Sequence, residues 1–184
     1  MIKLLGQITI PQKLLDDVKN REPDRIVKHV DGKSHAQNVV DLANDWPIEN
    51  YAHYDNDHCL IREYCKEWYK DVIPDVFLQE HGIAKPDNVI VLRVDPATFS
   101  VPHVDKFNHA LRMNPNFNID EVVRLWIPLE DSTFGQALFV GEQVLTKYSA
   151  GDVYSFDNLI HSAANAGLHT RYTMIVYTKK VDKV

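Results

Sequence analysis

The second half of the chain alternates apolar and polar positions over short runs that are rich in valine, isoleucine, threonine and aromatic residues. Such runs, bounded by glycine and polar turn residues, are typical of β-strands. The strand-like segments cover residues 88–95, 98–105, 122–131, 136–141, 143–149, 151–158 and 171–181. Short strands at nearly regular intervals favour a sandwich or barrel over β-α-β units.

The first half has a helical period instead. Pro11, with KLLDDVKN at residues 13–20, suits a short helix that has proline at its start. Residues 22–56 give weak signals, with one helix expected near Ala36–Ala43. We therefore expect a helical or irregular N-terminal layer over residues 1–87, and a strand-rich core over residues 88–181.

A clearer helix is expected from Asp57 onwards. Asp57 can cap its N-terminus, and four apolar side chains follow at helical spacing. These side chains are Leu60, Tyr64, Trp68 and Val72, after which Pro74 interrupts the pattern and Gly82 ends it. Helices followed by strands predict an α+β architecture, in which the helices pack on one face of a sheet.

The composition indicates one globular domain. The chain has 184 residues, 45% hydrophobic and 25% charged, with a net charge of −6 that is spread over both halves. A nucleic-acid partner is not expected, because phosphate binding needs a concentrated basic surface. No apolar run approaches the roughly 18 residues of a membrane helix, and Gln7 and Pro11 interrupt the only apolar patch at the N-terminus.

Cysteine usage suggests a reducing environment. Cys59 and Cys65 are the only cysteines, and they do not form a CxxC pair. Six positions apart in the expected helix, they would point to different faces, so a disulfide is not expected. We expect two half-buried thiols and a cytoplasmic location.

Three residues have the chemistry of a metal site. His103 and Asp105 lie one residue apart on a strand-like segment, so their side chains emerge on the same face. His161 follows a later strand, far enough along the chain for the strands to pass round a barrel and return. Two histidines and a carboxylate can occupy one face of an octahedral metal and leave three positions open, as in non-haem Fe(II) oxygenases.

An anion site is expected beside this metal site. Arg171 opens the last strand and Thr173 follows on the same face, so a guanidinium and a hydroxyl can bind one carboxylate. An inward-facing arginine without an anion would be costly. Arg124 shares a strand face with Trp126, and two arginines that approach the metal from different strands suit a dicarboxylate ligand.

These residues carry a resemblance to a known family. HVD at 103–105, His161 and RYT at 171–173 resemble the HxD…H…RxS/T signature of Fe(II)- and 2-oxoglutarate-dependent oxygenases, over roughly residues 88–180. VRLWIPL resembles the R-x-H-x-P-L strand of the aspartyl/asparaginyl β-hydroxylase-like branch. Arg124 is retained there, whereas Trp126 stands where the branch has a histidine that helps to hold 2-oxoglutarate. The family fold is a double-stranded β-helix, or jelly roll.

The resemblance implies a role for each group. His103, Asp105 and His161 would bind Fe(II), while Arg171 and Thr173 would grip the far carboxylate of 2-oxoglutarate. Oxygen would be the other co-substrate, and the reaction would hydroxylate a C–H bond with release of succinate and carbon dioxide. The carboxylate of Asp105 favours hydroxylation over halogenation. The branch suggests a small-molecule or peptide substrate, such as an amino acid that is free or within a peptide.

Two other functions fit parts of the pattern. A cupin-type enzyme would keep the metal without 2-oxoglutarate, although cupins generally use more histidines and have no counterpart of Arg171. A non-catalytic jelly-roll binding module would keep His103 and Asp105 as a hydrogen-bonded pair. His109 either coordinates the metal or, as we expect, lines the pocket entrance, and Tyr154 either packs in the core or borders the cofactor. Residues 106–120 would form a lid or an ordinary connection.

Overall fold

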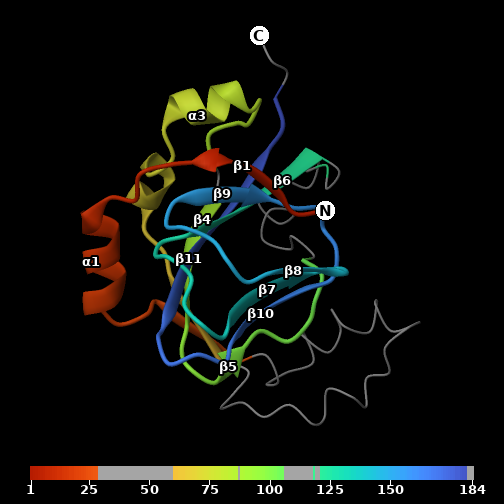
Figure 1. Cartoon of the computed structure of the whole chain (residues 1–184). Helices are drawn as coiled ribbons and strands as arrows, with labels where there is room; N and C mark the ends of the chain where they lie inside the picture. Colours follow the sequence, from red (N-terminus) through yellow and green to blue (C-terminus); the bar gives the residue numbers. More distant parts are fainter. Residues whose placement is uncertain (29–59, 87, 106–117, 119–120, 182–184) are drawn as a thin grey trace.

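Two antiparallel sheets face one another in the computed structural model, which describes residues 1–28, 60–86, 88–105, 118 and 121–181 (Figure 1). The large sheet has the strand order β1-β9-β6-β11-β4-β3-β2, and the small sheet has the order β5-β10-β7-β8. The strands of the large sheet are β1 (Lys3–Gln7), β2 (Arg25–Lys28), β3 (Leu60–Tyr64), β4 (Asn88–Val94), β6 (Val122–Pro128), β9 (Asp152–Ser155) and β11 (Arg171–Lys179). Those of the small sheet are β5 (Thr98–Phe99), β7 (Gln136–Val140), β8 (Gln143–Leu145) and β10 (His161–Asn165).

The connections from β4 to β11 make the fold a jelly roll. Successive strands pass from one sheet to the other, except for the β7–β8 hairpin within the small sheet. β11 lies between β4 and β6, and β10 lies between β5 and β7. This double-stranded β-helix is the fold that the sequence predicted for residues 88–181.

The two central strands of the large sheet have two different faces. Val123, Leu125 and Ile127 of β6 belong to the buried cluster beneath the helices, whereas Trp126 belongs to the cluster between the sheets. The predicted division of β6 into an apolar face and a face that carries Arg124 and Trp126 is therefore confirmed. On β11 the same alternation turns residues 171, 173, 175 and 177 towards the interior of the jelly roll.

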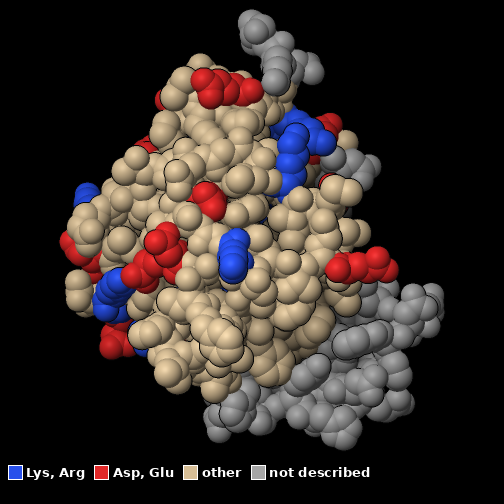
Figure 2. Space-filling model, viewed as in Figure 1, with Lys and Arg blue, Asp and Glu red and all other residues tan. Residues whose placement is uncertain are grey.

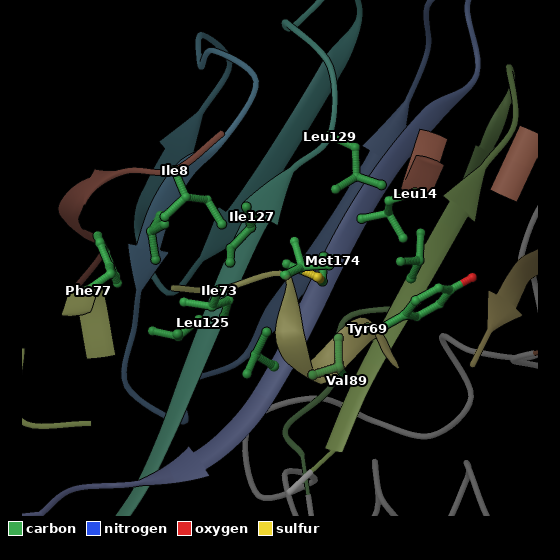
Figure 3. Close-up of a cluster of buried hydrophobic side chains, with 14 of the residues drawn as sticks. Ile8, Leu14, Tyr69, Ile73, Phe77, Val89, Leu125, Ile127, Leu129 and Met174 are labelled. Atoms are coloured by element: carbon green, nitrogen blue, oxygen red, sulfur yellow. The ribbon is translucent and has the colours of Figure 1, made fainter. Parts of the chain in front are cut away.

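Helices cover the outer face of the large sheet, as expected. They are α1 (Gln12–Asn20), the 3₁₀ helix η2 (Glu67–Asp71) and α3 (Asp75–Glu80). Leu14 of α1 and Phe77 of α3 pack with Leu125, Ile127 and Met174 in the largest buried cluster (Figure 3). Pro11 precedes α1 in an extended conformation, which confirms the expected proline start. No helix within the described residues is long and apolar enough to cross a membrane.

A charged cluster joins α1 to η2. The carboxylate of Asp17 accepts hydrogen bonds from Arg21 Nε (3.0 Å), Lys66 Nζ (2.5 Å) and the hydroxyl of Tyr69 (2.5 Å). Burial by itself raises the pKa of Asp17, but these three donors outweigh burial and lower the pKa to about 2. We call these four residues the Asp17 cluster.

The helix expected from Asp57 is wrong. Residues 60–64 form strand β3, and helical structure starts only at Glu67. Leu60 and Tyr64 are four positions apart, and such a pair lies on one face of a helix and also on one face of a strand. Their spacing therefore does not distinguish a helix from a strand. Pairing with β4 decides the outcome. Cys65, just after β3, is exposed rather than half-buried.

The N-terminal layer also contains more strand than expected. β1, β2 and β3 extend both edges of the large sheet, so the described part of residues 1–87 supplies these three strands as well as the helices. The expected helix at Ala36–Ala43, together with Cys59, lies outside the described residues. Basic and acidic side chains are interspersed over the face in Figure 2.

Candidate metal centre

The two histidines of the predicted triad are brought together by a β-bridge. His103 donates its backbone N–H to the carbonyl of His161 (3.0 Å), and His161 donates in return to His103 (2.9 Å). The imidazole centroids lie 4.3 Å apart. β10 therefore begins at His161 and holds its ring beside the segment that carries His103, which follows β5.

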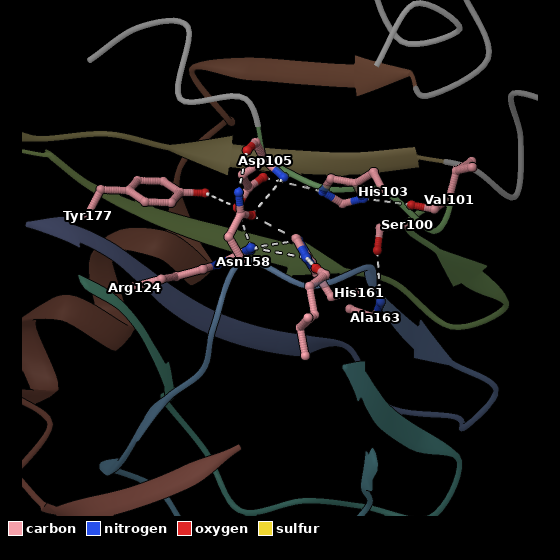
Figure 4. Close-up of polar contacts among 10 residues, drawn as sticks. Ser100, Val101, His103, Asp105, Arg124, Asn158, His161, Ala163 and Tyr177 are labelled. Carbon is pink, nitrogen blue, oxygen red and sulfur yellow. Dashed lines mark hydrogen bonds and ion pairs between the residues drawn. The ribbon is translucent and has the colours of Figure 1, made fainter. Parts of the chain in front are cut away.

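The side chain of Asn158, which the sequence analysis did not single out, holds Asp105 beside the two histidines. The amide of Asn158 brackets the backbone of Asp105, accepting from its N–H (3.2 Å) and donating to its carbonyl (2.9 Å). Ligand atoms of Asp105, His103 and His161 consequently all lie within 4.8 Å of one another (Figure 4). The structure thus brings the three predicted metal ligands into one cluster.

Both imidazoles have the tautomer that a metal requires. The Nδ1 atom of His103 lies 2.7 Å from the carbonyl of Val101, and that of His161 lies 2.9 Å from the carbonyl of Leu159. A carbonyl only accepts, so each Nδ1 carries the hydrogen and each Nε2 is the nitrogen that bears the lone pair. The Nε2 atoms face Asp105, at 3.6 Å from Oδ1 for His103 and 3.8 Å from Oδ2 for His161.

The charges of the cluster also suit a divalent cation. Burial lowers the pKa of His103, and it lowers the pKa of His161 well below the usual value, so both rings are neutral near pH 7. Burial opposes ionisation of Asp105, but the charge of Arg124 leads the interactions that outweigh burial and lower its pKa. Two neutral nitrogens and one carboxylate are the donor set of a facial triad.

A protein cation already contacts this donor set. Nη1 of Arg124 donates to the carboxylate of Asp105 and lies 2.6 Å from Nε2 of His161. The guanidinium stacks over the ring of Phe156 at 4.8 Å. Tyr177 adds a hydrogen bond from its hydroxyl to Oδ2 of Asp105 (3.2 Å). The contacts of Arg124 show that this cluster can bind a positive charge.

A cavity of about 250 Å³ opens from the cluster into the jelly roll. This volume is close to the lower end of the range for small-molecule sites, about 300–1,000 Å³. Besides the triad, its wall includes Arg25, Ile61, Glu63, Ile90, Leu92, Arg124, Trp126, Leu138, Arg171, Thr173, Ile175 and Tyr177. The predicted metal ligands and the predicted anion-binding residues thus line one cavity.

Arg171 lies in this cavity without an acidic partner. Its side chain is buried, and Nη1 donates to the carbonyls of Ala137 (2.9 Å) and Ala164 (3.4 Å). Within the described residues no carboxylate forms an ion pair with it, and its Nε has no hydrogen-bond partner. Burial lowers the pKa of Arg171, and the hydroxyl of Tyr148 opposes this shift only in part.

The hydroxyl of Thr173 is another orphaned polar atom of this wall, as is Nε of Arg124 at the metal end. Thr173 is 1% exposed, and its Oγ1 has no hydrogen-bond partner in the structure. It belongs to the same face of β11 as Arg171, because the two residues are two positions apart. A donor nitrogen and a hydroxyl, both buried and both without a partner, make a built but unsatisfied anion site.

The anion site and the cation cluster occupy opposite ends of the cavity. Across the β6–β11 register, Arg124 lies opposite Tyr177, and Pro128 lies opposite Thr173. Four residues along a strand correspond to about 13 Å. Arg124 contacts the triad, whereas Thr173 and Arg171 lie further along the strands. The apolar side chain of Ile175, opposite Trp126, lies between the two ends.

The remaining predicted pocket residues have different places. Trp126 lines the cavity and packs edge-on against Tyr148, with centroids 5.0 Å apart. Tyr154 lies behind Trp126, bonds to Asp152 at 3.1 Å, and is not among the described cavity-lining residues, so the packing alternative applies to it. His109 lies outside the described residues.

Sequence reasoning missed several residues of the site. Tyr177 has the same parity on β11 as Arg171 and Thr173, so strand alternation could have placed it in the cavity. Arg25 and Glu63 gave no such signal, because the strands that carry them had not been predicted. Asn158 likewise acts through contacts with the backbone of a residue 53 positions away.

Comparison with solved structures gives low overall similarity. No model of a known protein family matches the chain, and no curated protein matches it. A prolyl hydroxylase from Trichoplax adhaerens, in complex with a hypoxia inducible factor peptide fragment, is 14% identical over 91% of this chain and 88% of its own, with a TM-score of 0.46. An oxidoreductase of the 2OG-Fe(II) oxygenase family from Burkholderia pseudomallei is 14% identical over 67% of this chain and 68% of its own, with a TM-score of 0.40.

Cupins occur among the similar structures as well. A cupin domain from Bordetella pertussis is 13% identical over 50% of this chain and 80% of its own, with a TM-score of 0.36. At such identities and scores the activity has to be argued from the site itself. The strand order identifies the fold as a double-stranded β-helix.

Proposed function

We propose that this protein is an Fe(II)- and 2-oxoglutarate-dependent dioxygenase that hydroxylates a C–H bond of a small substrate. The overall reaction converts substrate C–H, 2-oxoglutarate and O₂ into substrate C–OH, succinate and CO₂. One observation carries the proposal. A single cavity has a His-Asp-His donor set at one end and, at the other, a buried guanidinium without an acidic partner.

The metal would be held by Nε2 of His103, Nε2 of His161 and the carboxylate of Asp105. Bound iron would supply the redox chemistry that activates oxygen, and three protein ligands leave positions open for co-substrates. The carbonyls that accept from the two Nδ1 atoms fix the orientation of the rings. Because the carboxylate of Asp105 is present, no ligand position is vacated for a halide, which supports hydroxylation.

2-Oxoglutarate matches the charges of the cavity, because it carries one carboxylate for each end. Its far carboxylate can accept from Nε of Arg171 and from Oγ1 of Thr173, which satisfies both orphaned atoms at once. Arg124 places a second positive charge at the metal end, where the other carboxylate of the co-substrate would bind. Ile175 and Trp126 between the two ends limit the access of water.

The partners follow from the same cavity. A small molecule or a short peptide segment is the proposed substrate class, and an amino acid within that class agrees with the resemblance to the aspartyl/asparaginyl β-hydroxylase-like branch. The net charge of −6 supports neither a nucleic acid nor an anionic membrane as partner. We propose a cytoplasmic location on the same sequence grounds as above.

The test is anaerobic titration of the Fe(II)-loaded protein with 2-oxoglutarate, followed by the visible charge-transfer band of the chelate. Arg171→Lys keeps the charge but loses the planar fork, and we expect the dissociation constant of 2-oxoglutarate to rise at least about 30-fold. Arg93→Lys is the matched control, because Arg93 lies on β4 of the same sheet and pairs with Asp95 outside the cavity. Both variants should bind Co²⁺ as the parent protein does.

The outcomes separate the alternative functions. A chelate band that weakens in Arg171→Lys and not in Arg93→Lys supports the proposal. Metal binding without any band contradicts it and favours a cupin-type enzyme. Failure of the folded protein to bind Fe(II), Co²⁺ or Mn²⁺ contradicts it in favour of a binding module.

A further inference from the structure

A pair of opposite charges lies in the wall of the cavity on the two strands at one edge of the large sheet. Arg25 of β2 lies opposite Glu63 of β3, and Glu63 lies opposite Leu92 of β4. Leu92 in turn lies opposite Thr173 of β11. These four residues form one row across the large sheet, and all but Leu92 are polar or charged. Arg25 and Glu63 both line the cavity that holds the triad.

The carboxylate of Glu63 is poorly compensated for its burial. Its side chain is only 18% exposed, and its one ion pair is with Nη1 of Arg25 at 3.7 Å, which is too long for a hydrogen bond. Among the described residues no hydrogen-bond donor contacts the carboxylate. Burial raises the pKa of Glu63, and Arg25 opposes this only in part. A carboxylate has about four acceptor positions, so Glu63 can accept from a ligand.

Arg25 has the opposite charge to Glu63 and is more exposed to solvent. Its side chain is 71% exposed, so the guanidinium borders the mouth of the cavity while Glu63 lies further inside. An exposed guanidinium can turn its fork towards a carboxylate that arrives from solvent. The pair therefore presents an anion-binding group and a cation-binding group side by side.

On the basis of the function proposed above, we propose that Arg25 and Glu63 recognise the primary substrate as a free α-amino acid. Glu63 accepts hydrogen bonds from the α-ammonium group, and Arg25 binds the α-carboxylate. An α-amino acid carries these two charges on one carbon, which matches two opposite charges on neighbouring strands about 5 Å apart. A residue within a peptide chain has neither charge and does not match.

The path from this pair to the metal cluster suits the rest of such a molecule. Ile61, Ile90 and Leu92 form the apolar wall near Glu63, and this wall can cover an aliphatic side chain. Tyr177 lines the same cavity as Glu63, and its hydroxyl bonds to Asp105 at 3.2 Å. The side chain of an amino acid held at Glu63 would thus extend towards the triad.

The experiment measures binding of free amino acids to the full chain by calorimetry and by thermal shift, with and without Co²⁺ and 2-oxoglutarate. The probes are the common L-amino acids, one at a time, followed by the N-acetyl and carboxamide derivatives of each amino acid that binds. Glu63→Gln and Arg25→Gln are nearly isosteric changes. Glu67→Gln is the matched control, because Glu67 is exposed on η2 and lies outside the cavity.

We expect at least one free amino acid to bind, and its N-acetyl derivative to bind at least about tenfold more weakly. Glu63→Gln should weaken the free amino acid about tenfold or more and remove the preference over the N-acetyl form. Arg25→Gln should remove the preference for the acid over its carboxamide, and Glu67→Gln should change neither preference.

Two results would overturn this inference while leaving the proposed function intact. One is a chelate band with 2-oxoglutarate but no binding of any free amino acid. The other is amino-acid binding that Glu63→Gln and Arg25→Gln affect no more than Glu67→Gln does. Absence of the chelate band instead contradicts the proposed function, and amino-acid binding is measured independently of that band.

Discussion

Replacing Thr173 by valine tests the anion site with almost no change in shape. The side chain is 1% exposed, and its Oγ1 has no hydrogen-bond partner in the structure. Valine fills the same volume with a methyl group in place of the hydroxyl, and both residues are favourable in strands. The substitution therefore changes hydrogen bonding and leaves the backbone of β11 as it is.

The two expected effects have opposite signs. An unsatisfied buried hydroxyl costs about 1–3 kcal/mol, and water that enters the cavity lowers this cost, so we expect Thr173→Val to stabilise the ligand-free protein by about 1 kcal/mol. That corresponds to a rise in Tm of about 2–4 °C for a chain of this size. Loss of one hydrogen bond to a carboxylate, about 1.5–3 kcal/mol, should weaken 2-oxoglutarate about 10- to 100-fold.

Thr178→Val is the matched control on the same strand. Thr178 is equally buried but faces away from the cavity, and its hydroxyl donates to the carbonyl of Ala84 at 2.8 Å. Loss of this satisfied hydrogen bond should destabilise the protein by about 1 kcal/mol without changing the affinity for 2-oxoglutarate. Urea unfolding and the chelate titration measure both quantities. If Thr173→Val destabilises the protein as Thr178→Val does and leaves 2-oxoglutarate binding unchanged, the Thr173 hydroxyl is not an unsatisfied part of an anion site.

Two further substitutions test the electrostatics of the fold. Arg124→Met removes the guanidinium that contacts Asp105 and His161 Nε2, the atoms that a metal would use. We expect Co²⁺, followed by its visible absorption, to bind about tenfold more tightly, and the metal-free protein to lose about 1–3 kcal/mol because Asp105 loses its charged partner; weaker Co²⁺ binding would contradict this competition. Asp17→Asn removes the carboxylate of the Asp17 cluster, whose pKa is lowered from 3.8 to about 2. Because the pKa is lower in the folded state, the ionised carboxylate stabilises the fold at pH values above 3.8. This stabilisation is lost as the pH falls from 3.8 towards 2. After allowance for solvent screening, Asp17→Asn should cost about 1 kcal/mol at pH 6 and much less near pH 2; an equal loss at both pH values, measured by urea unfolding, would show that the cluster does not titrate in this way.

The strands that carried a strict alternation were predictable from the sequence. In β6, Val123, Leu125 and Ile127 are apolar on one face, and this periodicity is incompatible with a helix. β10 was missed because HSAAN is made of small and polar residues, and its strand conformation depends on pairing with β5 and β7. Such long-range pairing has no local signature in the sequence.

The same distinction separates the predictable part of the site from the rest. His103 and Asp105 are two positions apart, so any extended conformation points both side chains the same way. Only the position of His161 beside them depends on the fold.

Arg25 and Glu63 are different, because their relation to Thr173 depends on the lateral order β2-β3-β4-β11. A change of one residue in the register of β3 would turn Glu63 to the opposite face of the sheet and bring Arg62 into the cavity. The charge that faces a substrate is therefore fixed by the pairing of β3 with β4, and the segment that looked helical in the sequence is the one on which the choice of substrate would depend.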